Sequence, residues 1–363
     1  MAGIYLHIPF CASFCTYCGF YSEACPGGAP FARYADALRR EMDLRRGYLE
    51  GCGPIKTLYF GGGTPSLLPA STFEKICADL RSVFDLSEVE EFTVEVNPED
   101  IATRADLLPA FKAAGVNRIS MGVQSFVDRH LKWMNRRHDA ATALKALEKL
   151  RAAGFDNISI DLIFGFAGLT DEEWLATLRQ AAALKPEHIS AYQMSIDPES
   201  ILAEKAARGE YTEPDDETCA RQYSMLQDTL EAAGYRQYEI SNFCLPGCYS
   251  RHNSAYWTRE AYLGLGPAAH SFNGCDRREW NPPSVEEYCS ALEAGHLPYG
   301  GGERLTIEDV YNERIMLGLR TARGVDKDLI KEPGILQDTG DTYRIPRDKF
   351  FICDSIIEDF LLT

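Results

Sequence analysis

The chain has 363 residues, of which 45% are hydrophobic and 25% are charged, as in ordinary globular proteins. This length suits one large α/β domain and a smaller C-terminal domain. The 54 acidic and 37 basic residues give a net charge of −17, which repels phosphate groups and argues against nucleic acid and anionic membranes as partners.

The beginning of the chain does not resemble a secretory signal, because the apolar run 4–8 is short and Pro9 follows it directly. No uncharged run is long enough to predict a transmembrane segment. Twelve cysteines without an export signal indicate a reducing compartment, where thiols bind metals or fill cores. We therefore expect a cytoplasmic protein.

The first 200 residues alternate between short apolar runs and amphipathic helical segments. The predicted strands cover residues 3–8, 57–60, 91–96, 118–121, 159–163 and 188–193. The predicted helices cover residues 31–49, 71–83, 104–114, 139–153 and 171–184. Such repeats indicate a parallel sheet with right-handed crossovers. We expect an α/β fold, an incomplete (β/α)6 TIM-like barrel with its chemistry at the carboxyl ends of the strands.

The pattern changes beyond residue 201. A predicted helix at 215–233 is followed by the Gly- and aromatic-rich stretch 238–274, which has no clean period and is expected to be a structured loop region. Helical segments and an apolar tail follow from residue 281. We expect three units: the barrel at 1–235, an irregular segment at 236–280, and a small, mainly helical C-terminal domain at 281–363.

Three cysteines, Cys11, Cys15 and Cys18, follow the first predicted strand with the spacing CxxxCxxC. Three thiolates on one short loop can hold three irons of a [4Fe–4S] cluster and leave the fourth iron without a protein ligand. An open iron can bind a small molecule, whereas a cluster with four cysteine ligands mainly carries electrons. The alternative is a zinc site completed by His7 or Cys25, since zinc takes four ligands.

Glycine and polar residues gather at the ends of the following strands. The run GGGTP at 61–65 lies at the end of the second predicted strand, where glycines let backbone amides approach a ligand or simply form a tight turn. Glu95, Gln124 and Asp161 lie on the next three strands. Each alone could be a capping or solvated residue, but together they outline a polar pocket. Arg136 is either a carboxylate clamp or a surface arginine.

The cysteine motif, the GGGTP turn, EVNP at 95–98 and GVQSF at 122–126 together resemble the radical S-adenosylmethionine (SAM) superfamily. More narrowly, they are similar to the branch that holds oxygen-independent coproporphyrinogen III oxidase and the HemW-type haem chaperone. The resemblance extends from Tyr5 to Arg323, which is nearly the whole chain.

The resemblance implies that the open iron is chelated by the amino and carboxylate groups of SAM. It also implies an electron from a reductant such as flavodoxin or ferredoxin. The implied contacts with SAM are Tyr5 and Tyr17 beside the cofactor, Gly62, Gly63 and Thr64 at its methionyl part, and Glu95, Gln124, Arg136 and Asp161 at further positions.

Two features favour the chaperone branch. The oxidase that this chain resembles has a further cysteine two residues after the third cluster ligand, where this chain has Phe20. The oxidase also usually carries an N-terminal extension, whereas the first strand here is expected to begin at residue 3. In addition, the family's C-terminal domain usually has more helix than 324–340 leaves room for, so we expect this domain to be shortened.

The sequence HNSAYW at 252–257 matches the HNxxYW motif associated with haem binding in the chaperone branch. The resemblance makes His252 an axial ligand of haem iron. Asn253, Tyr256 and Trp257 complete the motif, and its aromatic rings can lie against the macrocycle. Composition alone favours instead a His252 that forms hydrogen bonds inside a packed aromatic loop. The nearby pair Cys244 and Cys248 makes no complete metal site.

The favoured hypothesis is a radical SAM-type haem chaperone that binds haem and transfers it to an unknown acceptor protein. Its cofactors are then a [4Fe–4S] cluster, SAM and haem. The alternative is an oxygen-independent coproporphyrinogen III oxidase, which decarboxylates propionates in haem biosynthesis. A radical enzyme with another substrate is a third possibility, because a shared barrel does not fix the substrate.

Overall fold

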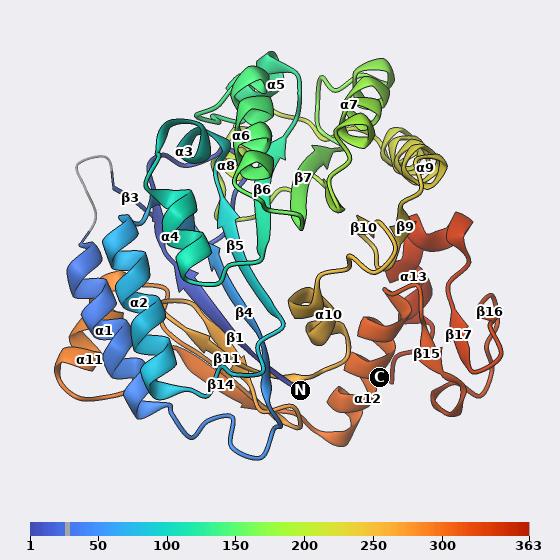
Figure 1. The fold of residues 1–363 in the computed structure, drawn as a ribbon. Coiled ribbons are helices and arrows are strands. Elements are labelled where there is room, and N and C mark those ends of the chain that lie inside the picture. Colours follow the sequence, from blue (N-terminus) through green and yellow to red (C-terminus); the bar gives the residue numbers. More distant parts are fainter. Residues whose placement is uncertain (26–29, 363) are drawn as a thin grey trace.

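The computed structural model describes residues 1–25 and 30–362. Residues 26–29, inside the predicted unit 1–235, and residue 363, the end of the predicted unit 281–363, lie outside the described residues. The main sheet contains twelve strands (Figure 1). Its strands are β1 (Ala2–Ile8), β4 (Ile55–Gly62), β5 (Glu91–Val96), β6 (Arg118–Gln124), β7 (Ile158–Phe164), β8 (His188–Gln193), β9 (Arg236–Gln237), β10 (Asn242–Cys244), β11 (Ala261–Leu265), β12 (His270–Phe272), β13 (Arg277–Trp280) and β14 (Gly301–Arg304).

The strand order is β14-β13-β12-β11-β1-β4-β5-β6-β7-β8-β10-β9. Neighbours pair in parallel from β11 through β1 to β8, and antiparallel strands extend the sheet at both sides. The two end strands, β14 and β9, do not pair with each other, so the barrel is not closed in the described part of the chain. The expected incomplete (β/α)6 barrel is confirmed.

Helices connect the parallel strands, as the alternating pattern predicts. The longer ones are α1 (Phe31–Leu44), α2 (Ala70–Val83), α6 (Ala140–Ala152), α7 (Asp171–Leu184) and α9 (Asp216–Ala232). Shorter helices are α3 (Pro98–Thr103), α4 (Leu107–Ala113), α5 (Asp128–Trp133), α8 (Ile201–Ala207) and the 3-10 turn η1 (Pro65–Leu67). Local signals set their starts: a capping box of Thr170 and Glu173, for example, begins α7.

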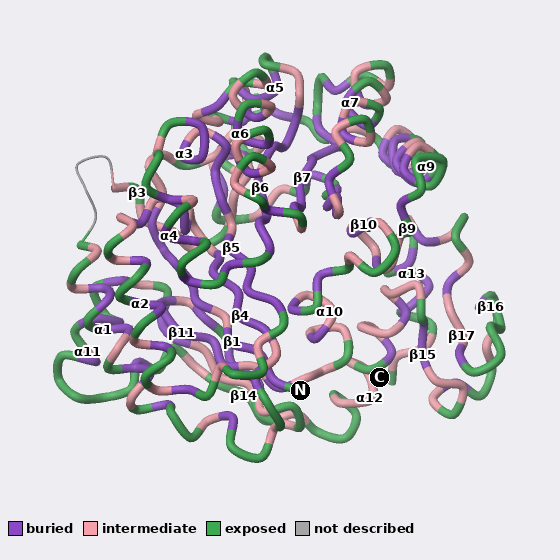
Figure 2. The backbone as a smooth tube through the Cα atoms, in the orientation of Figure 1, coloured by how far each residue is buried: buried purple, intermediate pink, exposed green. Residues whose placement is uncertain are grey.

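The strands are buried because they separate the helices from the barrel interior. On β1, the alternate residues Ile4, Leu6 and Ile8 are fully buried on one face. The other face carries Tyr5 and His7, which belong to a polar interior. Figure 2 shows the central strands as mainly buried, with exposure concentrated on the outer helices and loops.

The segment 236–280 is more regular than the sequence predicts. It contains the strands β9 to β13 and the helix α10 (Arg251–Trp257), and β11 pairs in parallel with β1. The strands have only two to five residues each, too few to show a period in the sequence. Regular structure here depends on pairing with strands far away in the chain. The unit boundaries at 235 and 280 stay a prediction.

The last part of the chain combines helices with short strands. Its elements are α11 (Val285–Glu293), β14, α12 (Ile307–Leu319), β15 (Val325–Asp326), η2 (Lys327–Leu329), β16 (Gln337–Asp338), β17 (Thr342–Arg344), η3 (Arg347–Ile352) and α13 (Cys353–Glu358). Strands β15, β17 and β16 form a small separate sheet. Among the described residues, none of the helices combines the length and apolarity that crossing a membrane requires.

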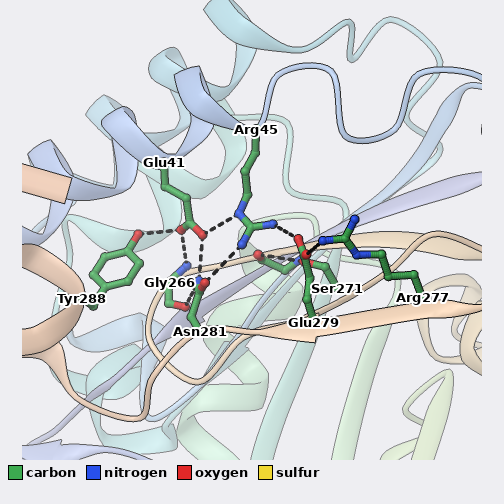
Figure 3. A network of polar contacts seen from close by, with 9 residues as sticks. Glu41, Arg45, Gly266, Ser271, Arg277, Glu279, Asn281 and Tyr288 are labelled. Atoms are coloured by element: carbon green, nitrogen blue, oxygen red, sulfur yellow. Dashed lines mark hydrogen bonds and ion pairs between the residues drawn. The ribbon is translucent and has the colours of Figure 1, made fainter. Parts of the chain in front are cut away.

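A buried polar network holds the edge of the barrel next to β1 (Figure 3). The Glu41 carboxylate on α1 accepts hydrogen bonds from the Gly266 backbone N–H at 2.9 Å, Asn281 Nδ2 at 2.7 Å and the Tyr288 hydroxyl at 2.7 Å. It also forms an ion pair with Arg45 at 3.1 Å. Glu41 is fully buried. The network therefore fastens α1 and α11 to the turn that follows β11.

We expect Glu41→Ala to lower the free energy of unfolding by about 3 kcal/mol, because it leaves the Gly266 N–H and the Tyr288 hydroxyl without this acceptor and removes one of the two carboxylates paired with the buried Arg45. Urea denaturation of the purified protein measures this loss. The control is Glu88→Ala, which removes an exposed partner of Lys56 and should change stability by less than about 0.5 kcal/mol. Equal losses in the two variants would contradict the stabilising role of the network.

Candidate cofactor site

The three motif cysteines lie on one loop at the carboxyl end of β1. The short parallel strands β2 (Phe10–Cys11) and β3 (Glu23–Ala24) close this loop at its base. There the Cys25 backbone N–H donates to the Cys11 carbonyl at 2.9 Å. Within the loop, the Cys18 N–H donates to the Cys15 carbonyl at 3.3 Å. All three thiols are half-buried, and therefore reachable.

The cysteine loop is fastened to the end of α5. The Thr16 N–H donates to the Met134 carbonyl at 3.1 Å, and the Thr16 hydroxyl donates to the Trp133 carbonyl at 3.0 Å. The Asn135 side chain donates to the Phe14 carbonyl at 2.6 Å. Asn135 has a φ of 57°, a left-handed conformation that asparagine tolerates and that turns the chain sharply after the helix.

This turn carries Arg136 into the site. Its Nη1 donates to the Cys15 sulfur at 3.3 Å, and its Nη2 donates to the Gly122 carbonyl at 2.7 Å. Its Nε is buried without a hydrogen-bond partner among the described residues. The sequence left open a surface position for Arg136, but the guanidinium instead lies beside a motif sulfur. Its proposed contact with a carboxylate stays a prediction.

The thiols lie close enough to influence one another. Burial is the main reason that the pKa of Cys18 is raised to about 11, and the neighbouring Cys15 and Cys11 raise it further. The Cys18 thiol is therefore hard to ionise without a positive partner. A bound metal supplies such a charge and holds cysteine sulfur as thiolate.

The glycine turn lies directly beside the cysteine loop. The Gly63 N–H donates to the Ile8 carbonyl and the Thr64 N–H to the Phe10 carbonyl, both at 2.8 Å. A Cβ on Gly63 would lie 2.8 Å from both carbonyl oxygens, and Gly62 has a φ of 103°. Both positions therefore need glycine. The Thr64 hydroxyl lies 3.4 Å from the Cys11 sulfur, so turn and cysteine motif share one site.

Two acids face the interior below this turn. Glu95 accepts from the Tyr59 hydroxyl at 2.7 Å and the Gly62 N–H at 3.2 Å. Asp161 accepts from the Ser120 hydroxyl at 3.4 Å. Burial is the main cause that raises the pKa of Glu95 to about 7 and that of Asp161 to about 6, and the nearby Asp161 raises the pKa of Glu95 further. The barrel interior thus holds two carboxyls that a positive ligand group would help to ionise.

The other predicted contacts lie around the same opening. Gln124 is buried on the bulged end of β6, with a φ of 66°. The Tyr5 hydroxyl lies 3.0 Å from His7 Nδ1, and His7 Nε2 lies 2.8 Å from the Tyr21 carbonyl. Tyr17 lies beside Cys15 and Arg136, and burial raises its pKa. Both nitrogens of His7 are therefore engaged, which weakens the zinc alternative that relies on this side chain.

The predicted haem motif lies elsewhere, at the amino ends of the strands. It forms α10, whose first turn is capped by the Ser250 side chain. Glu91, the first residue of β5, accepts from the backbone N–H groups of Arg251 at 2.8 Å and His252 at 2.9 Å. The structure therefore does not bring His252, Asn253, Tyr256 and Trp257 together with the cysteine loop.

The His252 imidazole is enclosed by the barrel. Its Nδ1 lies 2.8 Å from the Thr57 hydroxyl and its Nε2 lies 2.9 Å from the Tyr256 hydroxyl. The ring stacks on Tyr59 with centroids 5.0 Å apart, and the side chain is 1% exposed. Burial, and then the charge of Arg118, lower its pKa to about 3. Iron ligation by His252 stays a prediction, since it requires one ring nitrogen to exchange its partner.

Comparisons with known proteins indicate the family of this chain. The Radical SAM superfamily matches residues 5–181. A Heme chaperone HemW of Mycobacterium tuberculosis is 35% identical over 325 residues, which are 89% of this chain and 82% of the relative. The chain belongs to the HemW family of the radical SAM superfamily. A Heme chaperone HemW of Bacillus subtilis is 36% identical over 328 residues, with 90% of this chain and 85% of the relative covered.

A solved structure has the same fold. Coproporphyrinogen III oxidase (HemN) from Escherichia coli superposes with a TM-score of 0.83, over 99% of this chain and 89% of that chain. The two sequences are 23% identical. The likeness therefore concerns the fold of the HemW-family chain and leaves its chemistry to the site residues.

Sequence reasoning missed the polar residues around His252. Thr57 bonds to its ring, Glu91 caps its helix, and Arg118 is 1% exposed beside it. Each is a polar residue near the start of a central strand, and this position was the available signal. What it could not reveal is which distant helix these residues meet.

The raised pKa of Glu95 predicts a pH-dependent stability. Between pH 4.5, its ordinary value, and about 7, the folded protein holds a proton that the unfolded chain has lost. Stability from this group is therefore present at low pH and falls as pH rises through that window. Glu95→Gln should remove up to about 3 kcal/mol of this decline, measured by urea unfolding of the apoprotein between pH 5 and pH 8. Identical slopes in both proteins would contradict the assignment.

The enclosed geometry of His252 predicts a structural effect of its removal. His252→Ala leaves the hydroxyls of Thr57 and Tyr256 without a partner and opens a cavity, so we expect a loss of about 2 to 4 kcal/mol. Thermal and urea unfolding measure it. His296 is exposed after α11, and His296→Ala is the matched control with an expected change below about 0.5 kcal/mol. A stable His252→Ala variant would show that the ring is loosely held.

Proposed function

We propose that this HemW-family protein binds haem and transfers it to an acceptor protein, and that it carries a [4Fe–4S] cluster with exchangeable SAM. The observation that carries the proposal is the similarity to proteins named Heme chaperone HemW, which extends over 89% of the chain. The chemistry of the cysteine loop supports the cofactors independently of those names.

The cluster would be held by Cys11, Cys15 and Cys18. Three adjacent half-buried thiols, with an arginine donor on one sulfur, fit a group that stabilises thiolates. When bound, such a cluster supplies an open iron and a single electron. Hydrogen bonds to ligand sulfur tune the reduction potential, and Arg136 is placed to supply one to Cys15.

SAM would lie between the cysteine loop and the strand ends. Its expected contacts are Tyr5, Tyr17, Gly62, Gly63, Thr64, Glu95, Gln124, Arg136 and Asp161. The glycine turn leaves backbone groups accessible because no Cβ covers them. The unpartnered Nε of Arg136 can donate to a carboxylate, and the acids of Glu95 and Asp161 can accept from hydroxyl or amino groups. These residues orient the ligand and do not react with it.

The remaining partners follow from this reading. The HNxxYW residues His252, Asn253, Tyr256 and Trp257 belong to the proposed haem-binding part, and α10 would have to open for haem to reach them. The reductant would be a flavodoxin or ferredoxin. All twelve cysteines are free thiols, as a reducing cytoplasm would keep them.

The alternative of coproporphyrinogen oxidation is less well supported. At the position of the oxidase's additional cysteine this chain has Phe20, whose side chain is 75% exposed and offers no thiol.

The test combines haem binding, haem transfer and turnover in anaerobically reconstituted protein. We expect stoichiometric haem binding, transfer to an apo-haemoprotein, and no conversion of coproporphyrinogen III. Cys15→Ser should abolish the cluster, measured as bound iron and sulfide, while Cys25→Ser on the same loop should retain it. Porphyrinogen decarboxylation without haem binding would replace the chaperone by the oxidase. Loss of metal in the Cys25→Ser variant would favour zinc.

A further inference from the structure

Arg118, the first residue of β6, carries a guanidinium into the barrel interior. It lies two residues before Ser120, whose hydroxyl donates to Asp161, so both side chains are on the inner face of the strand. Arg118 is only 1% exposed. After burial, its charge is the cause that lowers the pKa of His252 and of His188, which fits a guanidinium near both imidazoles.

This buried guanidinium has no partner of opposite charge. Within residues 1–25 and 30–362, the Arg118 side chain forms neither an ion pair nor a hydrogen bond, and its Nε is enclosed by protein. The acids on or beside the neighbouring strands accept from other donors: Glu91, Glu95, Asp161 and Glu239. A buried charge without a partner is strongly unfavourable. The interior therefore favours a negative charge beside Arg118 that the chain itself does not place there.

The neighbouring strand offers a second unsatisfied donor at the same level. Thr93 of β5 is paired with Arg118 in the parallel register and is completely buried. It lies two residues before Glu95, which accepts from Tyr59, and so it also is on the inner face. Its hydroxyl has no partner among the described residues. A water molecule would satisfy both donors but leave the charge, whereas an anion satisfies the donors and the charge.

Asn157 lies on the other side of Arg118. Its carbonyl accepts from the Ile119 N–H at 3.0 Å, which continues the ladder between β6 and β7. Its Oδ1 is likewise buried without a partner in the described part of the chain. Half a turn of the amide exchanges Oδ1 for the Nδ2 group, which makes Asn157 a third donor. Three adjacent positions of the sheet can therefore donate to one ion.

We infer that Arg118 and Thr93, together with Asn157, bind a small monovalent anion inside the barrel, either a halide or a short carboxylate such as formate. One guanidinium balances one negative charge, and the enclosure of both side chains limits the ion to a few atoms. The site lies at the amino ends of the strands, where α10 packs with His252. It goes beyond the proposed haem function and does not rest on it.

The first test is thermal unfolding of the full-length, cluster-reconstituted protein at constant ionic strength, with sodium bromide or sodium formate replacing sodium gluconate. Gluconate is too large for the enclosed site. An ion that binds only the folded protein raises the unfolding midpoint once its concentration exceeds Kd. We expect such a rise with bromide, with formate or with both, and the salt that produces it identifies the ligand. A midpoint that rises in neither salt would overturn the inference.

Variants separate the site from general salt effects on stability. Arg118→Met removes the charge, and Thr93→Val removes the second donor, so each should abolish the rise or shift it to at least tenfold higher concentration. The side chain of Arg304 is 86% exposed, and Arg304→Met is the control that should keep the rise. An unchanged rise in both Arg118→Met and Thr93→Val would contradict the assignment.

Crystals of the wild-type protein provide a test that does not depend on the folding of any variant. Crystals grown in bromide should show an anomalous peak beside Arg118 Nε and Thr93 Oγ1, or crystals grown in formate should show the carboxylate there. A water molecule at this position in both salts would overturn the inference.

Discussion

The parallel pairing of β1 with β4 is the constraint on which the site depends. Ile8, the last residue of β1, pairs with Gly62, so the two strands end at the same level. The cysteine loop leaves one strand end and the glycine turn leaves the other. Hydrogen bonds from Gly63 to Ile8 and from Thr64 to Phe10 then continue the ladder beyond the strands. A shift of register by one residue would exchange the faces of the strand and separate the sulfurs from the turn.

Glycine makes this continued ladder possible. A Cβ on Gly62 would lie 2.6 Å from the His7 ring, and one on Gly63 would meet carbonyl oxygens. The glycine turn therefore lies closer to the cysteine loop than it could with any other residue type at positions 62 and 63. Its consequence is that thiols, backbone amides and the carboxyl of Glu95 lie close together. A positive charge beside them is favoured, because burial, and then the nearby Asp161, have raised the pKa of Glu95 to about 7.

The sequence predicts local features of this fold better than distant ones. The strands β1, β4, β5, β6, β7 and β8 are largely apolar runs of six to eight residues, and the cysteine motif is contained in eight residues, so both can be read directly. The contact of Arg136 with Cys15 depends on the left-handed turn at Asn135, which no local period indicates. The burial of His252 depends on pairing of β11 with β1, across more than 250 residues, which a single sequence does not encode visibly. The resemblance of the motif around His252 suggests a haem ligand, while the topology places the ring inside the barrel.

This topology also gives the two ends of the barrel a physical connection. His252 stacks on Tyr59 at the amino ends, and the Tyr59 hydroxyl donates to Glu95, which accepts from Gly62 at the carboxyl ends. Each contact is direct, and all lie within the buried interior, where side chains cannot shift independently. A displacement of α10 would therefore alter the packing of Tyr59 and the hydrogen bonding of Glu95. A contiguous path of this kind can carry coupling between the proposed haem handling and the cofactor site, provided that the path has two stable arrangements.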